Sequence, residues 1–217
     1  MMIQIKLCGM TRPEDARAAE AAGANAVGFI FAPSPRQITA EQARRISKEL
    51  GPFISRVGVF VNATRDEIAA VLDQVDLDVL QLHGSETPEQ VEALLPLGRR
   101  VIKSIRVKDA ESLARLDEYP VDTFLLDSYV PGVPGGTGHI FDWSLATEIA
   151  RKRRIILAGG LTPDNVAEAI KVVQPFGVDT SSGVEESPGV KDHEKMQQFI
   201  ARARSSYHEY ASGRLFR

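Results

Sequence analysis

Residues 3–22, IQIKLCGMTRPEDARAAEAA, join a short apolar run to an amphipathic one. The run at residues 3–7 is rich in Ile and Leu and is one of eight short apolar runs, most of which have few polar breaks, as is typical of buried strands. Residues 13–22 have a helical pattern, with Thr11 as a candidate cap and Pro13 in the first helical turn. This segment therefore predicts one strand followed by one helix.

The same unit recurs along the whole chain, and its apolar runs suit strands that are buried on both faces. The predicted strands are residues 3–7, 26–31, 56–61, 78–82, 100–105, 123–127, 154–158 and 177–180. The predicted helices are residues 13–22, 39–50, 64–75, 87–95, 110–116, 143–151, 163–173 and 193–206. Thr64 and Thr87 each stand three residues before Glu or Gln, which predicts capping boxes, and Thr162 before Pro163 is a further candidate cap.

Eight strand–helix units in 217 residues, about 27 residues each, predict an α/β fold. The predicted architecture is a single (β/α)8 TIM barrel over residues 1–217, with residues 207–217 as a C-terminal extension. The alternative is an open doubly wound sheet, but no G-x-G-x-x-G motif follows the first strand.

Composition narrows the class of protein. Hydrophobic residues make up 43% of the chain, the formal net charge is −3, and there is a single cysteine. The chain has no excess of basic residues that would favour binding to nucleic acid, and a single cysteine cannot form an internal disulfide bond. The apolar runs are shorter than the roughly 20 residues that span a bilayer, and the start of the chain lacks a secretory signal pattern. We expect a cytoplasmic protein with no nucleic-acid or membrane partner.

Barrel enzymes carry their chemistry where strands end and the following loops begin, and unusual residues gather there. Cys8 closes the first strand and could act as base or nucleophile if its pKa were lowered, although a lone cysteine is commonly a small buried side chain. Lys6 shares a strand face with it and could favour the thiolate. Asp127 closes an apolar strand, where partial desolvation would suit a proton donor; it could also cap the next loop.

Two further strand ends carry candidates for substrate binding. Arg36 stands in a proline-stiffened loop and could clamp a carboxylate through two hydrogen bonds, or be a solvated surface residue. His83 could contact substrate or transfer a proton, or be structural. The Gly/Pro-rich residues 129–138 predict either a lid or a plain connection.

The ends of the seventh and eighth predicted strands predict a phosphate site. They carry Gly159 and Gly160 in one loop, and Ser182 and Gly183 in the other. Loops at these two positions bind phosphate in many barrels, because glycine lets backbone N–H groups approach the anion. Asp179, beside the second loop, could position substrate or be structural.

The motifs that hold these residues resemble phosphoribosylanthranilate isomerases. In chain order they are KLCGMTR (6–12), GFIFAPSPR (28–36), VGVFVN (57–62), LQLHGSE (80–86), LDS (126–128) with GGTGHIFDW (135–143), LAGGLTP (157–163), GVDTSSGVE (177–185) and PGVKD (188–192). The matches extend over about residues 3–203, and their order makes them specific together although each is weak alone. Residues 207–217 extend past the usual end of the family.

The resemblance implies an Amadori rearrangement of N-(5-phosphoribosyl)anthranilate in tryptophan biosynthesis, with no cofactor or metal. It implies that Asp127 is the general acid and Cys8 the general base, and that Arg36 holds the anthranilate carboxylate. The residues implied for the phosphate are Gly159, Gly160, Ser182 and Gly183. His83 and Asp179 would contact substrate at the rim.

Other readings remain open at this point. Indoleglycerol-phosphate synthases, histidine-pathway isomerases and ribulose-phosphate epimerases are also phosphate-binding barrels. The epimerase requires metal ligands on several strands, and the histidine-pathway enzyme favours Asp where Cys8 stands. A non-catalytic phosphate-ligand sensor would bind without turnover. We expect a monomer rather than a homodimer.

Overall fold

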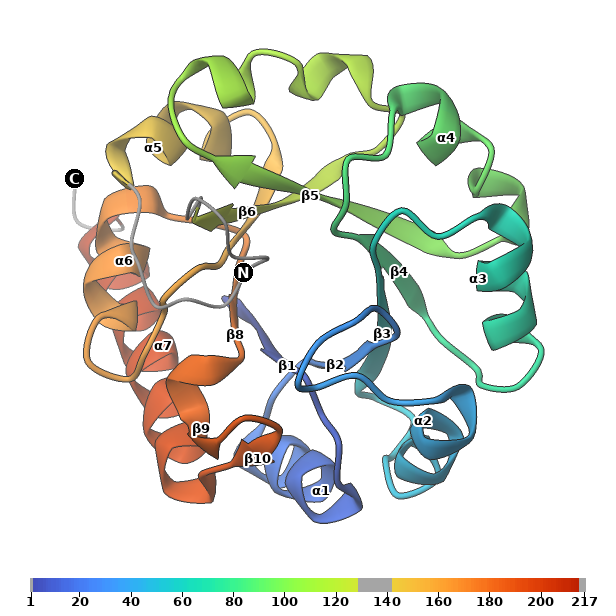
Figure 1. The fold of residues 1–217 in the computed structure, drawn as a ribbon. Coiled ribbons are helices and arrows are strands. Elements are labelled where there is room, and N and C mark those ends of the chain that lie inside the picture. The colour runs from blue at the N-terminus through green and yellow to red at the C-terminus, as the bar shows by residue number, and fades with distance from the viewer. Residues whose placement is uncertain (1, 129–141, 215–217) are drawn as a thin grey trace.

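The computed structural model describes residues 2–128 and 142–214, so the predicted lid at 129–138 lies outside the described residues. Eight parallel strands form a closed barrel in chain order, and β1 pairs with β8 to close it (Figure 1). The strands are β1 (Gln4–Cys8), β2 (Ala26–Ile30), β3 (Ser55–Phe60), β4 (Val79–Leu82), β5 (Arg100–Val107), β6 (Thr123–Ser128), β7 (Arg154–Leu157) and β8 (Gly177–Thr180). The predicted (β/α)8 barrel is confirmed, and the open sheet is excluded.

Helices surround the barrel on the outside (Figure 1). They are α1 (Pro13–Ala22), α2 (Ala40–Ser47), α3 (Arg65–Leu72), α4 (Pro88–Glu92), α5 (Ser144–Ala150), α6 (Val166–Val173) and α7 (His193–Arg214). Short 3-10 turns supplement them: η1 (Leu95–Leu97), η2 (Glu111–Leu113), η3 (Leu116–Glu118) and η4 (Ser182–Val184). Within the described part of the chain, no helix is long and apolar enough to cross a membrane.

The helix predicted at residues 110–116 is wrong, because η2 and η3 occupy this connection instead. Leu113 ends η2 and Leu116 begins η3, and both side chains are buried. Asp109 accepts a hydrogen bond from the Ser112 backbone N–H at 3.0 Å, which fixes the start of the segment.

Two of the predicted caps are confirmed and two are wrong. Thr64 and Thr87 form capping boxes at the starts of α3 and α4. Thr11 does not cap α1; its hydroxyl donates to the Gly189 carbonyl, far along the chain. Thr162 lies three residues before Asn165, which occupies the N-cap position of α6. The Thr11 hydroxyl group is thus used by another loop, whereas the Thr162 hydroxyl accepts a local hydrogen bond from the Asp164 backbone N–H at 3.2 Å.

The core has two layers. Ile102, Leu125, Ile156 and Ala158 fill the barrel interior. A larger cluster lies between the strands and the helices, and it includes the fully buried Phe124 from β6. This packing fixes the strands rigidly, so that residues at the strand ends hold set positions around one mouth.

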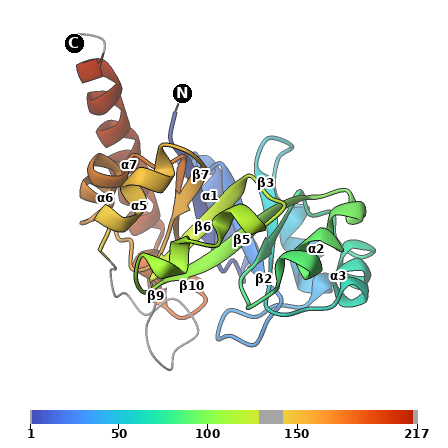
Figure 2. The ribbon, with the colours of Figure 1, turned by 90° about the horizontal axis from the view of Figure 1, so that it is seen from above.

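One element was not predicted from the sequence. After β8 and η4, strands β9 (Glu185–Ser187) and β10 (Val190–Lys191) form a small antiparallel hairpin. The far end of α7, which continues past its predicted limit at residue 206, extends beyond the barrel on the side of the chain's N-terminus, away from β9 and β10 (Figure 2). Residues 207–214 of the C-terminal extension therefore lie away from the mouth that carries the site.

Candidate active site

One cavity at the carboxyl ends of the strands brings the predicted site residues together. Eight of the nine line it: Cys8, Arg36, His83, Asp127, Gly159, Gly160, Asp179 and Ser182. The ninth, Gly183, follows Ser182 in η4. Gln81 and Arg106 also line the cavity and were not predicted to have roles, although their positions near the ends of β4 and β5 could have drawn attention to them.

Cys8 lies at the end of β1 and is 6% exposed. Burial raises the pKa of the Cys8 thiol; Lys6 acts in the opposite direction without outweighing burial. The role of Cys8 as a base, as predicted from the sequence, depends on a lowered pKa. The structure shows the opposite direction, because burial outweighs the effect of Lys6. The resting group is a thiol, with a neighbouring cation that favours its deprotonation.

The closure of the barrel explains the charges beside Cys8. Lys6 on β1 lies opposite Asp179 on β8, and its ammonium nitrogen donates to Asp179 Oδ2 at 2.9 Å. Burial opposes the charge on Lys6, but Asp179 and Cys8 together raise its pKa, so it stays cationic. Asp179 Oδ1 is buried and has no hydrogen-bond partner among the described residues. An unpaired buried acceptor on a cavity wall is suited to a donor on a ligand.

Asp127 ends β6 in contact with His83. The distance between His83 Nε2 and Asp127 Oδ2 is 3.1 Å, and His83 Nδ1 lies 3.0 Å from Gln81 Nε2. Because the Gln81 amide nitrogen can only donate, Nδ1 accepts and Nε2 carries the proton toward Asp127. His83 thus fixes the orientation of the Asp127 carboxyl group. Asp127 is buried, with 5% of its surface exposed.

The two glycine-containing loops approach each other closely. Gly159 and Gly160 have φ angles of 82° and 69°, in the left-handed region that favours glycine. A Cβ atom at Gly183 would lie 1.9 Å from the carbonyl oxygen of Leu161, so no larger residue fits there without a shift. Thr180 Oγ1 donates to the same carbonyl at 2.7 Å. The arrangement supplies backbone groups from both loops at one edge of the cavity, as anion sites in barrels require.

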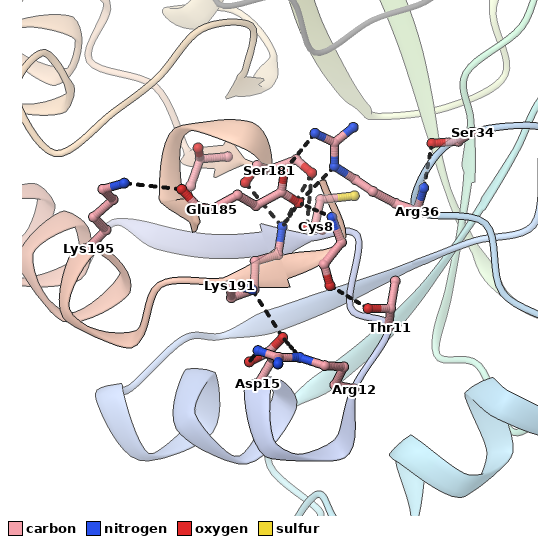
Figure 3. Close-up of polar contacts among 12 residues, drawn as sticks. Cys8, Thr11, Arg12, Asp15, Ser34, Arg36, Ser181, Glu185, Lys191 and Lys195 are labelled. Carbon is pink, nitrogen blue, oxygen red and sulfur yellow. Dashed lines mark hydrogen bonds and ion pairs between the residues drawn. The ribbon is translucent and has the colours of Figure 1, made fainter. Parts of the chain in front are cut away.

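Arg36 is not a solvated surface residue. Its side chain is 14% exposed and forms a two-bond ion pair with Glu185 of β9, at 2.7 Å from Nε and 2.6 Å from Nη2 (Figure 3). Lys191 of β10 contacts the same carboxylate at 2.8 Å. Glu185 and Lys191 were missed as site residues, although both stand in motifs quoted above, because residue type alone does not reveal a partner 149 positions away.

The described residues contain no group of three or more His, Cys, Asp or Glu side chains that could hold a metal ion. The charged groups of the cavity are instead single acids and bases and their ion-pair partners. Such a set can bind an anionic ligand at two separate ends and can transfer protons between them.

Comparison with known proteins gives consistent matches. The family model described as "N-(5'phosphoribosyl)anthranilate (PRA) isomerase" matches residues 5–202. An N-(5'-phosphoribosyl)anthranilate isomerase of Pseudomonas fluorescens is 52% identical over 201 residues, which cover 91% of this chain and 97% of that protein.

Solved structures agree with these matches. The phosphoribosyl anthranilate isomerase of Thermotoga maritima has a TM-score of 0.87 and 45% identity, covering 94% of this chain and all of that one. A phosphoribosyl anthranilate isomerase in complex with reduced 1-(o-carboxyphenylamino)-1-deoxyribulose 5-phosphate has a TM-score of 0.85, 43% identity and the same coverage. The family model covers most of the chain, and the Pseudomonas fluorescens relative is 52% identical over nearly its whole length, so the chain belongs to the N-(5'-phosphoribosyl)anthranilate isomerase family.

Proposed function

We propose that this chain converts N-(5-phosphoribosyl)anthranilate into 1-(2-carboxyphenylamino)-1-deoxyribulose 5-phosphate, an Amadori rearrangement in tryptophan biosynthesis. The observation that carries the proposal is that Cys8 and Asp127 line one cavity with Arg36 and the two glycine loops. Relatives that are about half identical bear the name of this isomerase, and one solved relative holds a reduced form of the product.

Asp127 is proposed as the general acid. It protonates the furanose ring oxygen, the bond between that oxygen and carbon 1 breaks, and the anilino nitrogen supplies the electron pair that forms the Schiff base. His83, at 3.1 Å, keeps the carboxyl group oriented for this transfer. A positioned acid of this kind contributes about 100- to 10,000-fold to a rate.

Cys8 is proposed as the general base. Its thiolate removes the proton from carbon 2 of the Schiff base, and the electron pair moves to the nitrogen to give an enolamine. Protonation at carbon 1 and loss of the hydroxyl proton on carbon 2 then yield the ketone, with no net change in protons. Lys6 lies beside the thiol and lowers its pKa relative to burial alone, which increases the thiolate population. The positively charged Schiff base also favours the loss of this proton.

The two ends of the substrate carry negative charge, and the cavity has a cationic or N–H-rich group for each. Arg36 is proposed to bind the anthranilate carboxylate. The loops with Gly159, Gly160, Ser182 and Gly183 are proposed to bind the phosphate. Asp179, through its unpartnered Oδ1, is proposed to accept a hydrogen bond from a sugar hydroxyl group.

Complementation tests the proposal in a cell. A bacterial strain that lacks this isomerase and requires tryptophan should grow without tryptophan when it expresses the chain. A variant with Cys8 replaced by alanine, expressed at the same level, should not restore growth. Failure of the unchanged chain to restore growth, while it accumulates as folded protein, would count against the proposed reaction.

The pH dependence should report the environment of Cys8. Burial raises the pKa of the Cys8 thiol, and the thiolate is the reactive form. The value of kcat/KM should therefore increase with pH, and the midpoint of this increase should lie at a higher pH than the pKa of an ordinary thiol. Lys6→Met removes the cation that lowers the pKa of Cys8 and should move the midpoint to higher pH. Lys6→Arg keeps the charge and is the control. Profiles of kcat/KM against pH measure this, and a midpoint that Lys6→Met leaves in place or moves to lower pH would contradict it.

Gly183→Ala should weaken the phosphate site. The added Cβ would overlap the Leu161 carbonyl, so the two loops must separate, at a cost of about 1–3 kcal/mol in folding free energy. KM should rise, because the backbone groups of the two loops no longer converge. Gly98→Ala is the matched control: its φ angle of 73° strains alanine, but nothing lies near its added Cβ. It should lose stability in denaturant unfolding and keep its KM; an equal change of KM in both variants would remove the phosphate assignment.

Oligomeric state and location remain predictions from the sequence. The chain is expected to be a cytoplasmic monomer, whereas a solved relative from Thermotoga maritima is described as dimeric. Light scattering on the purified protein should give the mass of one chain. Twice that mass over a range of concentrations would overturn the expectation.

A further inference from the structure

We infer that Glu185 is a positioning residue that holds the Arg36 guanidinium with its free end toward the substrate carboxylate, and that Lys191 keeps this cluster positively charged. The inference rests on the proposed function, since it concerns the same carboxylate. The β9–β10 hairpin then belongs to the part of the site that recognises the substrate carboxylate. It holds Arg36 in the orientation that binds an arylamine bearing a carboxylate.

The geometry of the ion pair leaves one end of Arg36 available. Glu185 takes Nε and Nη2 on one side of the planar guanidinium group. Five N–H groups are available on an arginine side chain, so two on Nη1 and one on Nη2 are left at the other end. Nη1 donates to none of the residues that the structure describes, and Figure 3 shows it on the side away from Glu185. A second carboxylate can therefore bind in two-bond fashion at that end.

An Arg–Glu pair without a further cation would bind an anion weakly, because it has no net charge. Arg36 and Glu185 cancel each other, and the pair would offer only hydrogen bonds. Lys191 changes this, because its ammonium group lies 2.8 Å from Glu185 Oε1 and its side chain is fully buried. Burial lowers the pKa of Lys191, and Glu185 acts in the opposite direction. With Lys191 protonated, the three groups together carry one net positive charge beside the cavity. Arg36 and Lys191 also outweigh the effect of burial on Glu185 and lower its pKa, so the carboxylate stays ionised.

The hairpin is anchored independently of any substrate. The backbone N–H of Lys191 donates to Asp15 Oδ2 at 3.1 Å, and Asp15 on α1 is fully buried. Asp15 also pairs with Arg12 and with His193 at the start of α7 (Figure 3 shows the Arg12 contact). The hairpin that carries Glu185 is therefore tied to α1, and Lys195 of α7 donates to the Glu185 backbone carbonyl at 3.1 Å. The orientation that Glu185 gives to Arg36 is built in before substrate arrives, which reduces the entropy lost on binding.

A merely structural ion pair makes a different prediction. If Glu185 only stabilised the fold, its loss would reduce stability and affect all ligands of the cavity alike. If it positions Arg36, its loss should affect ligands with the arylcarboxylate and spare ligands with the phosphate alone.

The experiment compares two ligands on three proteins. Glu185→Gln removes the charge and one of the two acceptors, and Glu186→Gln makes the same change at the exposed neighbouring residue of β9. Dissociation constants are measured by calorimetry for reduced 1-(o-carboxyphenylamino)-1-deoxyribulose 5-phosphate, and inhibition constants for ribose 5-phosphate, which lacks the arylcarboxylate. Glu185→Gln should weaken the first ligand by about 10- to 100-fold and the second by less than about twofold. Glu186→Gln should change neither.

Each other outcome decides against the inference. Unchanged binding of the carboxylate ligand to Glu185→Gln, or equal weakening of both ligands, would overturn it. Glu185→Asp serves if Glu185→Gln does not fold, because a shorter carboxylate keeps the charge but cannot reach both nitrogens; it should show the same selectivity between ligands. An unchanged protein that fails to isomerise phosphoribosylanthranilate would instead contradict the proposed function, so the two failures are distinct.

Discussion

Replacing Cys8 with alanine should lower kcat by about 100- to 10,000-fold, the range that a positioned general base contributes. Alanine has no group that can take the proton from carbon 2. Cys8→Ser should be almost as inactive, because a serine hydroxyl group is far less acidic than a thiol and offers no base near neutral pH. The measurement is the single-turnover rate with saturating enzyme.

Folding and binding need to be separated from chemistry in these variants. Cys8 is buried, but its side chain is small, so Cys8→Ala should cost only about 1 kcal/mol in unfolding free energy. Both variants should still bind the reduced product analogue. Turnover near that of the unchanged protein would remove Cys8 from the role of base, and joint loss of binding and folding would show a structural role instead.

Asp127→Asn should also lower kcat by about 100- to 10,000-fold, because an amide cannot protonate the ring oxygen. The substitution keeps the size of the side chain and its contact with His83 at the end of β6, so the site should keep its shape. The ring-opening step should become limiting, and the substrate should remain as the closed furanose in the complex.

Asp122→Asn makes the same chemical change just before β6, at an exposed residue away from the cavity. It should leave kcat and KM within about twofold of the unchanged protein, as surface changes of this kind usually do. Asp127→Asn with retained turnover would remove the acid assignment. Equal loss in both variants would point to a general defect of β6.

The barrel could be predicted from the sequence because each of its strands is a local signal. Apolar runs buried on both faces need no knowledge of their neighbours, and their regular alternation with helical patterns allows few topologies. The predicted helix at 110–116 failed where the connection is short and two leucines three residues apart were enough to anchor it. Local patterns do not reveal how far a connection must reach.

The positions of the catalytic candidates could also be predicted from local signals. Strand ends converge in any barrel, so Cys8 and Asp127 could be placed at one mouth without a structure. Their partners could not, because the Lys6–Asp179 pair depends on how the first strand meets the last. The Arg36–Glu185 pair depends on a hairpin with no strong pattern of its own. The direction of the Cys8 pKa shift depends on burial, which residue order does not give.

The most direct measurement is the fluorescence of the anthranilate group when the purified protein is mixed with phosphoribosylanthranilate. We expect the fluorescence to decay to that of the deoxyribulose product with the unchanged chain, and at a rate at least about 100-fold lower with Cys8→Ala. A decay with the unchanged chain no faster than in buffer alone, from folded protein that binds the product analogue, would contradict the account and favour a binding protein without turnover.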